Sequence, residues 1–413
     1  MSCSLRLSFV ASLLTVFGPL GCTRTPLADL QATGSDALVI LEDTGATPDA
    51  APLPDSGAMD AATLDSGATS GGDDASEGDD ASAGDDAGSL GQDAGSLGRD
   101  ADAPPADAAL ADAAAPPVDA GMPPSGIDPS MQGPCTTRVV NEQVRRGRRT
   151  TPVAAHIPTG QPATALIVFI PGFQLESRRY SELAERVASH CFVVVRADPP
   201  DPLVGVSHVE MAEDVRAVID WGLASPAVMG SLTANPGIAT MGHSLGGKVA
   251  VMTAHRDSRV GAVFGLDPVN GGNPLTGFSQ SLPDIIPAEL MGKTIPMGFA
   301  GETTNSQGSF GRPACAPADE NYSKFYDAAT SATWAAEWTF TGADHMDFLD
   351  DRAGCGFICS ACPDGTADEA AVQSSLHTLA VAFFRRHFRS DMSMDAFLFG
   401  GQLVPGVTVR KRP

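Results

Sequence analysis

Residues 23–134 contain no phenylalanine, tryptophan or tyrosine, and their only basic residues are Arg24 and Arg99. The same segment holds 22 aspartate and glutamate residues, so it carries most of the formal net charge of −24. A segment with so little apolar surface cannot offset the entropy that ordering would cost, and its like charges repel one another. The composition therefore predicts a disordered acidic linker over 23–134 that tethers a folded domain.

A long apolar run that would cross a membrane is also missing. Residues 1–22 carry one early basic residue, an apolar run and then small residues. This pattern is typical of a secretory signal and is too short for a spanning helix. The ending PLGC resembles a bacterial lipoprotein cleavage box, which predicts lipidation and membrane anchoring at Cys22. The alternative is ordinary cleavage and release, and in both cases we expect an exported protein, held in the cell envelope or secreted.

The rest of the chain, 135–413, lacks a large basic surface, since it holds 28 acidic and 23 basic residues. The cluster RRGRR at 145–149 is short and has no aromatic residues within it, so we expect no nucleic-acid partner. A segment of this length can bury a substantial core. We therefore expect one folded domain over 135–413, whose oligomeric state the sequence does not indicate.

Cysteines are few, but the domain contains an even number of them. They are Cys135, Cys191, Cys315, Cys355, Cys359 and Cys362. In an exported protein an even number favours disulfides, whose pairing cannot be deduced from spacing. Cys355, Cys359 and Cys362 have the close spacing of a zinc site, but a fourth ligand would be needed. The sequence therefore favours disulfides over a metal site, and we expect no metal.

Apolar segments of two periods alternate along the domain. Continuous apolar runs predict buried strands, and amphipathic stretches predict helices. The expected strands are 165–170, 191–198, 237–244, 260–267, 295–302 and 336–343. The expected helices are 180–190, 208–224, 244–256 and 368–388. This alternation predicts an α/β fold with a mainly parallel central sheet flanked by helices.

The motif Gly-His-Ser-Leu-Gly places Ser244 where a predicted buried strand meets a predicted helix. That context makes Gly-x-Ser-x-Gly a nucleophile elbow, in which a sharp turn exposes the serine oxygen above the sheet. Gly242 and Gly246 give the turn its room, and the helix N-terminus supplies free backbone N–H groups. Ser244 is therefore the candidate nucleophile of an α/β-hydrolase fold.

A serine nucleophile requires a base and an orienting acid, which follow it in this fold in the order acid, then histidine. Among eight histidines, His345 alone stands in a loop directly after a predicted strand that follows the elbow, so it is the candidate base. Two acids are candidates. Asp267 ends the strand 260–267, and Glu302 ends the next strand, the more usual position. Spacing leaves both open.

Several longer motifs resemble the chlorophyllases, α/β-hydrolases that cleave an ester side chain from chlorophyll. They are GLDPVNG, CAPADENYSKFYDA, DHMDFLDD, PGFQLESRRYSELAERVASHCFVVV and MGHSLGG, and the likeness covers most of 150–385. The resemblance implies Ser244 as nucleophile, His345 as base and Asp267, rather than Glu302, as acid. Two positions depart from it. Leu245 stands where plant members have arginine, and Pro171-Gly172 replaces a His-Gly pair, which is similar to polyester hydrolases and cutinase-like lipases.

These residues together predict a serine carboxylic-ester hydrolase that forms an acyl-enzyme on a small hydrophobic ester and needs no cofactor. The expected oxyanion donors are the backbone N–H groups of Leu245 and Phe173. Apolar residues in 268–290, with Phe173 and Leu175, are expected to face the substrate. Two alternatives are a polyester hydrolase, lipase or acyltransferase on the same three residues, and a non-catalytic surface-binding protein on a hydrolase fold.

Overall fold

The computed structural model describes residues 126–273, 276–308, 312 and 314–413. The predicted signal at 1–22, the predicted lipidation site Cys22 and most of the predicted linker lie outside the described residues. Residues 126–134, the last part of the predicted linker, are described and contact helix α2 (Ser181–Ser189). The backbone N–H of Gly133 donates to Ser189 Oγ at 2.8 Å. The folded region therefore begins before Cys135.

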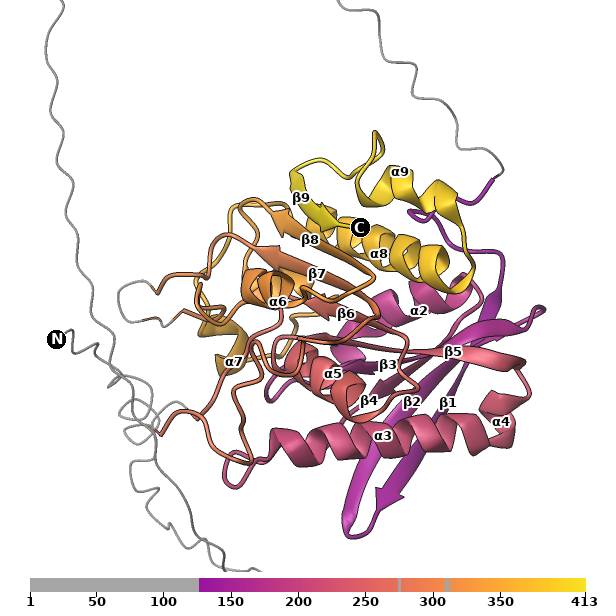
Figure 1. Ribbon diagram of the computed structural model, residues 1–413, viewed down its shortest axis with the longest axis horizontal. Coiled ribbons are helices and arrows are strands. Elements are labelled where there is room, and N and C mark those ends of the chain that lie inside the picture. Colours follow the sequence, from indigo (N-terminus) through magenta and orange to yellow (C-terminus); the bar gives the residue numbers. More distant parts are fainter. Residues whose placement is uncertain (1–125, 274–275, 309–311, 313) are drawn as a thin grey trace, which may run out of the picture. The chain divides into compact units, whose positions relative to one another are not determined.

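Within the described residues, nine strands form one sheet in the order β1-β2-β4-β3-β5-β6-β7-β8-β9 (Figure 1). The six strands from β4 to β8 in this order pair in parallel, and β1, β2 and β9 pair antiparallel at the two edges. The strands are β1 (Thr136–Arg146), β2 (Arg149–Thr159), β3 (Ala163–Ile170), β4 (Val193–Ala197), β5 (Leu232–His243), β6 (Ala262–Leu266), β7 (Pro296–Glu302), β8 (Trp334–Phe340) and β9 (Val407–Arg412). A mainly parallel sheet flanked by helices confirms the predicted α/β-hydrolase fold.

Strand β3 shows why the sheet is covered on both faces. Ala165, Ile167 and Phe169 belong to one core cluster. Their neighbours Leu166, Val168 and Ile170 belong to the other. Because successive side chains of a strand point to opposite faces, a run without polar residues requires cover on both sides.

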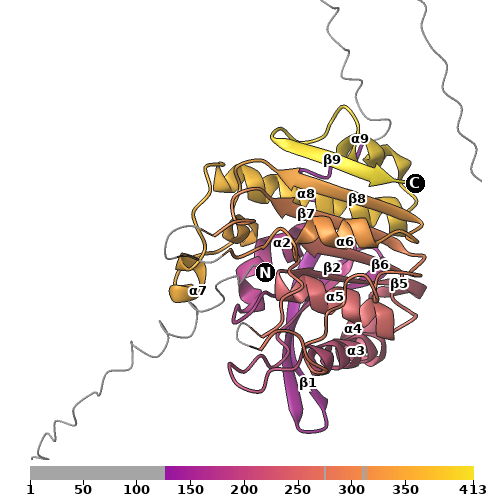
Figure 2. The same cartoon turned by 60° about the vertical axis from the view of Figure 1, so that its left-hand side comes forward.

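Helices supply that cover in two layers, which Figures 1 and 2 show on either side of the sheet. One core cluster packs under α2, α8 (Glu369–Phe388) and α9 (Asp395–Leu398). The other packs under α3 (His208–Ala224), α5 (Leu245–Arg256) and α6 (Tyr322–Ala328). The remaining short elements are η1 (Ser177–Tyr180), α4 (Pro226–Met229), η2 (His345–Phe348), α7 (Phe357–Ser360) and η3 (Met392–Met394).

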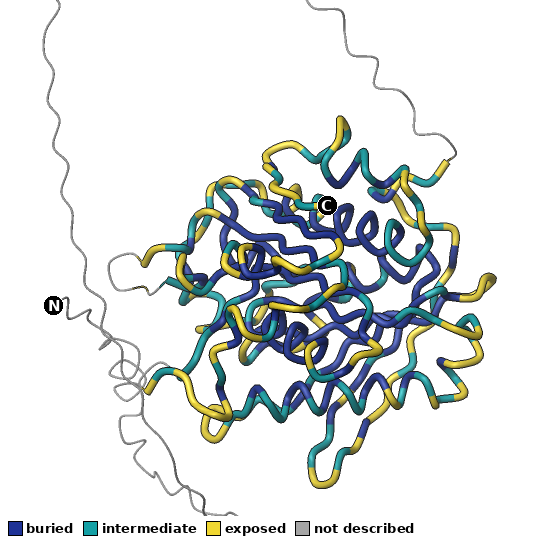
Figure 3. Tube along the Cα trace, in the orientation of Figure 1, coloured by how far each residue is buried: buried dark blue, intermediate teal, exposed yellow. Residues whose placement is uncertain are grey.

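The exposed parts of the folded region lie mostly in loops and along the edge strands (Figure 3). Strand β1 is largely exposed, and the cluster RRGRR at 145–149 spans the end of β1, the hairpin turn and the start of β2. Neither this hairpin nor β9 was predicted from the sequence. Both edges of the sheet lack the continuous apolar runs that mark the central strands.

Three disulfides use all six cysteines of the domain: Cys135–Cys191, Cys315–Cys362 and Cys355–Cys359. The zinc alternative is therefore wrong, because each cysteine of the 355–362 cluster is bonded to another sulfur. Disulfides are typical of exported proteins, which supports export of this chain. Among the described residues, no helix combines the length and the apolar character needed to cross a membrane.

Candidate active site

Ser244 lies in a sharp turn between β5 and α5 and adopts φ 55° and ψ −122°. Helix α5 begins at Leu245, one residue later than predicted, because Ser244 occupies the cap position with this left-handed φ. Glycine is required on both sides of the turn. A Cβ on Gly242 would lie 2.4 Å from the carbonyl carbon of Gly246, and a Cβ on Gly246 would lie 2.1 Å from the Ile170 oxygen. The turn therefore depends on the two glycines of the motif.

His345 lies between Ser244 and Asp267. Its Nε2 atom is 2.9 Å from Ser244 Oγ, and its Nδ1 atom is 2.5 Å from Asp267 Oδ2. This network is satisfied when the Nδ1–H donates to the carboxylate and the serine hydroxyl donates to Nε2. His345 is 3% exposed and Asp267 is fully buried. The structure thus brings together three residues that are distant in the sequence.

The two candidate acids have different partners. Asp267 follows β6 and reaches His345, and its complete burial raises its pKa against the opposing effect of the His345 hydrogen bond. Glu302 ends β7, and its Oε2 accepts the backbone N–H groups of Thr304 and Asn305 instead. Burial, followed by the nearby charge of Asp267, raises the pKa of Glu302 to about 9. The raised pKa favours the neutral form of Glu302 at pH 7. Its hydrogen bonds among the described residues go to its own turn and not to His345.

His345 stands at the start of the short helix η2, and not in an open loop as the sequence analysis expected. Asp344 caps this helix by accepting the Met346 N–H at 2.8 Å, and its own N–H donates to Asp347 Oδ2. Arg352 donates to Asp344 Oδ1 at 2.6 Å and to Asp347 Oδ1 at 2.8 Å. The first two acidic residues of the motif DHMDFLDD, Asp344 and Asp347, thus stabilise the turn that carries His345.

His243, the residue before Ser244, connects a distant tyrosine to the main chain of His345. The Tyr180 hydroxyl donates to His243 Nδ1 at 2.7 Å, and His243 Nε2–H donates to the His345 carbonyl oxygen at 3.0 Å. Complete burial lowers the pKa of His243 well below its usual value, so this ring is neutral. Tyr180 was not predicted to belong to the site, because no sequence pattern links residues 63 positions apart.

The predicted oxyanion donors lie beside Ser244. A Cβ on Gly172 would meet Ser244 Cβ and His243 Nδ1 at 3.2 Å each, so the loop that carries Phe173 passes close to the serine. Within the described part of the chain, no protein acceptor binds the backbone N–H of Phe173 or of Leu245.

The apolar side chains predicted to face a substrate differ in how far they are exposed. Phe173 is 39% exposed and Phe278 is 40% exposed, whereas Leu175 is buried and belongs to a core cluster. Lys248, one turn after Leu245 on α5, is buried with its Nζ 5.3 Å from the centre of the Phe278 ring. Residues 274–275 of the predicted substrate segment lie outside the described residues. Across the described ranges, His, Cys, Asp and Glu form no group of three that could hold a metal ion.

Comparison with known proteins gives one consistent family. The Chlorophyllase family model matches residues 131–405. Chlorophyllase-1, chloroplastic, of Citrus sinensis is 27% identical over 249 residues, which cover 58% of this chain and 73% of that protein. Chlorophyllase-1 of Arabidopsis thaliana is 28% identical over 251 residues, which cover 57% and 75%. Chlorophyllase-2 of the same plant is 26% identical over 251 residues, with 55% and 74% covered.

The match extends from the segment just before β1 to the turn before β9, so it includes the elbow, both candidate acids and the helix that carries His345. Chlorophyllases are a family within the α/β-hydrolases, which agrees with the observed sheet and supports a hydrolase as the class of enzyme. Because the family model matches more than half of the residues of this chain, the chain belongs to the Chlorophyllase family.

Proposed function

We propose that this chain is a serine carboxylic-ester hydrolase in which Ser244 is the nucleophile, His345 the base and Asp267 the orienting acid. The observation that carries the proposal is the continuous hydrogen-bond chain through His345, with contacts of 2.9 Å to Ser244 and 2.5 Å to Asp267. A serine hydroxyl of ordinary acidity becomes a nucleophile only when an adjacent base takes its proton. Membership of the Chlorophyllase family supports the same class of reaction.

In the proposed reaction, His345 Nε2 accepts the Ser244 proton while the serine oxygen attacks the ester carbonyl carbon. The backbone N–H groups of Phe173 and Leu245 donate to the oxyanion that forms, and each such donor is typically worth about 2.7–4 kcal/mol. His345 then protonates the leaving alcohol, and the acyl group remains on Ser244. A water molecule gives a proton to His345 and attacks the acyl carbon, which releases the free acid and restores the Ser244 hydroxyl.

Asp267 has two functions in this scheme. By accepting the Nδ1–H of His345 it selects the tautomer whose Nε2 faces Ser244. Its carboxylate also stabilises the imidazolium that forms when His345 takes a proton. Glu302 is bonded to its own backbone turn and its raised pKa favours the neutral form, which supports Asp267 over Glu302 as the acid.

The proposed substrate is a hydrophobic ester. Phe173 and Phe278 are the partly exposed aromatic side chains on the two loops expected to face it. The relatives' name, chlorophyllase, makes a chlorophyll ester the first compound to test. The sequence Pro171-Gly172-Phe173 favours a second candidate, a polyester hydrolase or lipase that uses the same three residues.

The central experiment treats the full chain with a fluorophosphonate probe and maps the adduct by mass spectrometry. We expect one adduct, on Ser244, and none in Ser244→Ala. No adduct, or an adduct on another residue, contradicts the mechanism and favours a non-catalytic surface protein. Rates on chlorophyll, a short nitrophenyl ester and a polyester film then rank the substrates, and an added alcohol acceptor reveals acyl transfer.

We also propose that the protein is exported and anchored to a membrane through a lipid on Cys22. The three disulfides support export, because they require an oxidising compartment. Incorporation of labelled palmitate into the full chain, and its loss in Cys22→Ala, tests the anchor. Absence of label together with release of soluble protein would identify the chain as secreted.

A further inference from the structure

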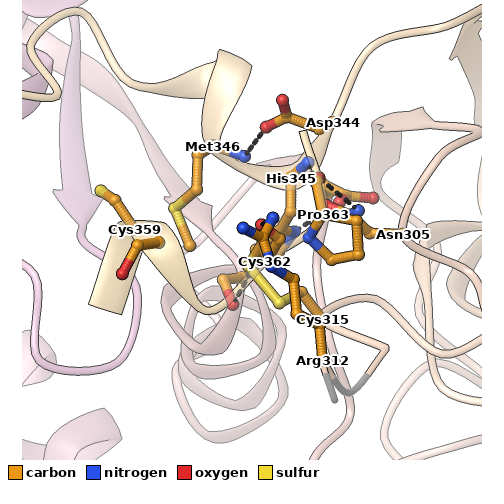
Figure 4. The surroundings of a disulfide bond; sticks show 12 residues. Asn305, Arg312, Cys315, Asp344, His345, Met346, Cys359, Cys362 and Pro363 are labelled. Atoms are coloured by element: carbon orange, nitrogen blue, oxygen red, sulfur yellow. Dashed lines mark hydrogen bonds and ion pairs between the residues drawn. A yellow bond between two sulfur atoms is a disulfide. The ribbon is translucent and has the colours of Figure 1, made fainter. Parts of the chain in front are cut away.

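Asn305 lies behind His345 and is fully buried. Its side-chain Oδ1 accepts the backbone N–H of His345 at 2.8 Å, and its Nδ2 donates to the Pro363 carbonyl oxygen at 2.8 Å. Its backbone N–H donates to Glu302 Oε2 at 2.7 Å, and its carbonyl oxygen accepts the Ala316 N–H at 3.2 Å. Figure 4 shows Asn305 beside His345 and Pro363. Asn305 therefore joins its own turn after β7 to three other parts of the chain, at Ala316, His345 and Pro363.

The disulfide Cys315–Cys362 connects two of these parts. Cys315 precedes Ala316, and Cys362 precedes Pro363, so each cysteine is the neighbour of an Asn305 partner. The two cysteines have Cα atoms 5.6 Å apart (Figure 4). The disulfide thus holds together the two segments that bond to the side chain and main chain of Asn305.

The main chain of His345 is held on two sides. Asn305 accepts its N–H, and His243 donates to its carbonyl oxygen. The imidazole must meet Ser244 and Asp267 at the same time, so a small shift of its main chain lengthens at least one of those contacts. Because misplacement of a reacting group by about 1 Å can lower a rate about 100-fold, the bond from Asn305 bears directly on the proposed reaction.

We propose that Asn305 is a positioning residue for His345 and that the Cys315–Cys362 disulfide keeps Asn305 in place. Asn305 touches neither the serine oxygen nor the imidazole ring in the contacts described, so it acts through the His345 main chain. The inference rests on the proposed function, since it assumes that His345 acts as the base. Each part has its own test.

The first test compares Asn305→Ala with the parent full chain on a short nitrophenyl ester. We expect kcat to fall at least about tenfold while KM changes less than about twofold, because the substrate loops are unaltered. The rate of Ser244 modification by a fluorophosphonate should fall in parallel, and circular dichroism should show a folded domain. An unchanged kcat in folded protein overturns the role of Asn305.

The second test removes disulfides in matched pairs. Cys315→Ala/Cys362→Ala opens a loop with a sequence separation of 47, and Cys135→Ala/Cys191→Ala opens one of 56. The chain-entropy effects of the two bonds are therefore similar, but Cys135–Cys191 contacts neither Asn305 nor its partners. We expect similar drops in melting temperature and a loss of kcat, at least about fivefold, in the first variant alone.

Equal kcat values in the two double variants overturn the role of the disulfide. This comparison can be made even when Asn305→Ala does not fold. The outcomes also separate the inference from the proposed function. If the parent chain neither hydrolyses esters nor reacts at Ser244, the proposed function fails. If the parent is active and the folded variants keep its kcat, only the positioning inference fails.

Discussion

The carboxyl groups of Asp267 and Glu302 are both buried near the same end of the sheet, but only Asp267 bonds His345. Glu302 instead accepts two backbone N–H groups of the turn that follows β7. The position of an acid after a particular strand is therefore not enough to define its function.

Asp267→Asn and Glu302→Gln should have very different effects on catalysis. We expect Asp267→Asn to lower kcat by roughly 10³–10⁴, because an amide no longer selects the reactive tautomer of His345. Glu302→Gln should keep most of the activity, since a neutral amide oxygen can accept the same two N–H groups. Steady-state rates on a nitrophenyl ester measure both, and loss of activity in the glutamine variant alone would reverse our assignment.

Glu302 should make stability depend on pH. Its pKa is raised from 4.5 to about 9 in the folded protein, so between these values the folded state binds more protons than the unfolded state. The free energy of unfolding must therefore fall as pH rises through this range, by at most about 1.4 kcal/mol per pH unit from this group. Glu302→Gln has no carboxyl that titrates at this position. The melting temperature of this variant minus that of the parent should therefore increase from pH 5 to pH 8. A constant difference would contradict the raised pKa.

Tyr180→Phe should destabilise the protein and slow the reaction. Loss of the hydroxyl leaves His243 Nδ1 buried without its donor, which typically costs about 1–3 kcal/mol. We expect kcat to fall several-fold as well, because His243 holds the His345 carbonyl. Tyr326→Phe is the control, since that buried tyrosine's hydroxyl takes part in no hydrogen bond among the described residues. Denaturant unfolding and kcat should be nearly unchanged in the control.

Gly246→Ala should disrupt the elbow. The added Cβ would lie 2.1 Å from the backbone oxygen of Ile170, and backbone at that position cannot move without displacing β3. We expect a loss of about 1–3 kcal/mol or more in stability and a large loss of Ser244 labelling. Gly261→Ala is the control, because its nearest contact would be 3.7 Å away. Equal stability of the two variants would show that the elbow tolerates a side chain.

The central part of the fold was predictable because its signals are local. Helix α3 begins and ends as predicted, since its amphipathic pattern follows Ser207, whose side chain accepts the Glu210 N–H. The apolar run of β3 likewise defined a strand buried on both faces. Strand β1 was missed because its side chains are mostly exposed and polar, which leaves only a weak signal.

The sequence was sufficient to predict which types of residue form the candidate site and their order along the chain. Ser244 and His345 follow from their places after strands, whereas the choice of Asp267 needed the family resemblance. The contacts of Asn305 and Tyr180 join residues 40 and 63 positions apart, and no spacing rule reports such pairs. The disulfide pairing is also a property of the folded chain, since Cys355 pairs with Cys359 while Cys362 pairs with the distant Cys315.

The bond between Cys135 and Cys191 has a mechanical consequence. Cys135 immediately precedes β1, an edge strand that is hydrogen-bonded to one neighbour along its length. A pull on the chain from its N-terminal side would otherwise unzip this strand one pair at a time. The covalent link passes such a load directly to the residues just before β4, inside the sheet, so the fold resists being peeled open from that end.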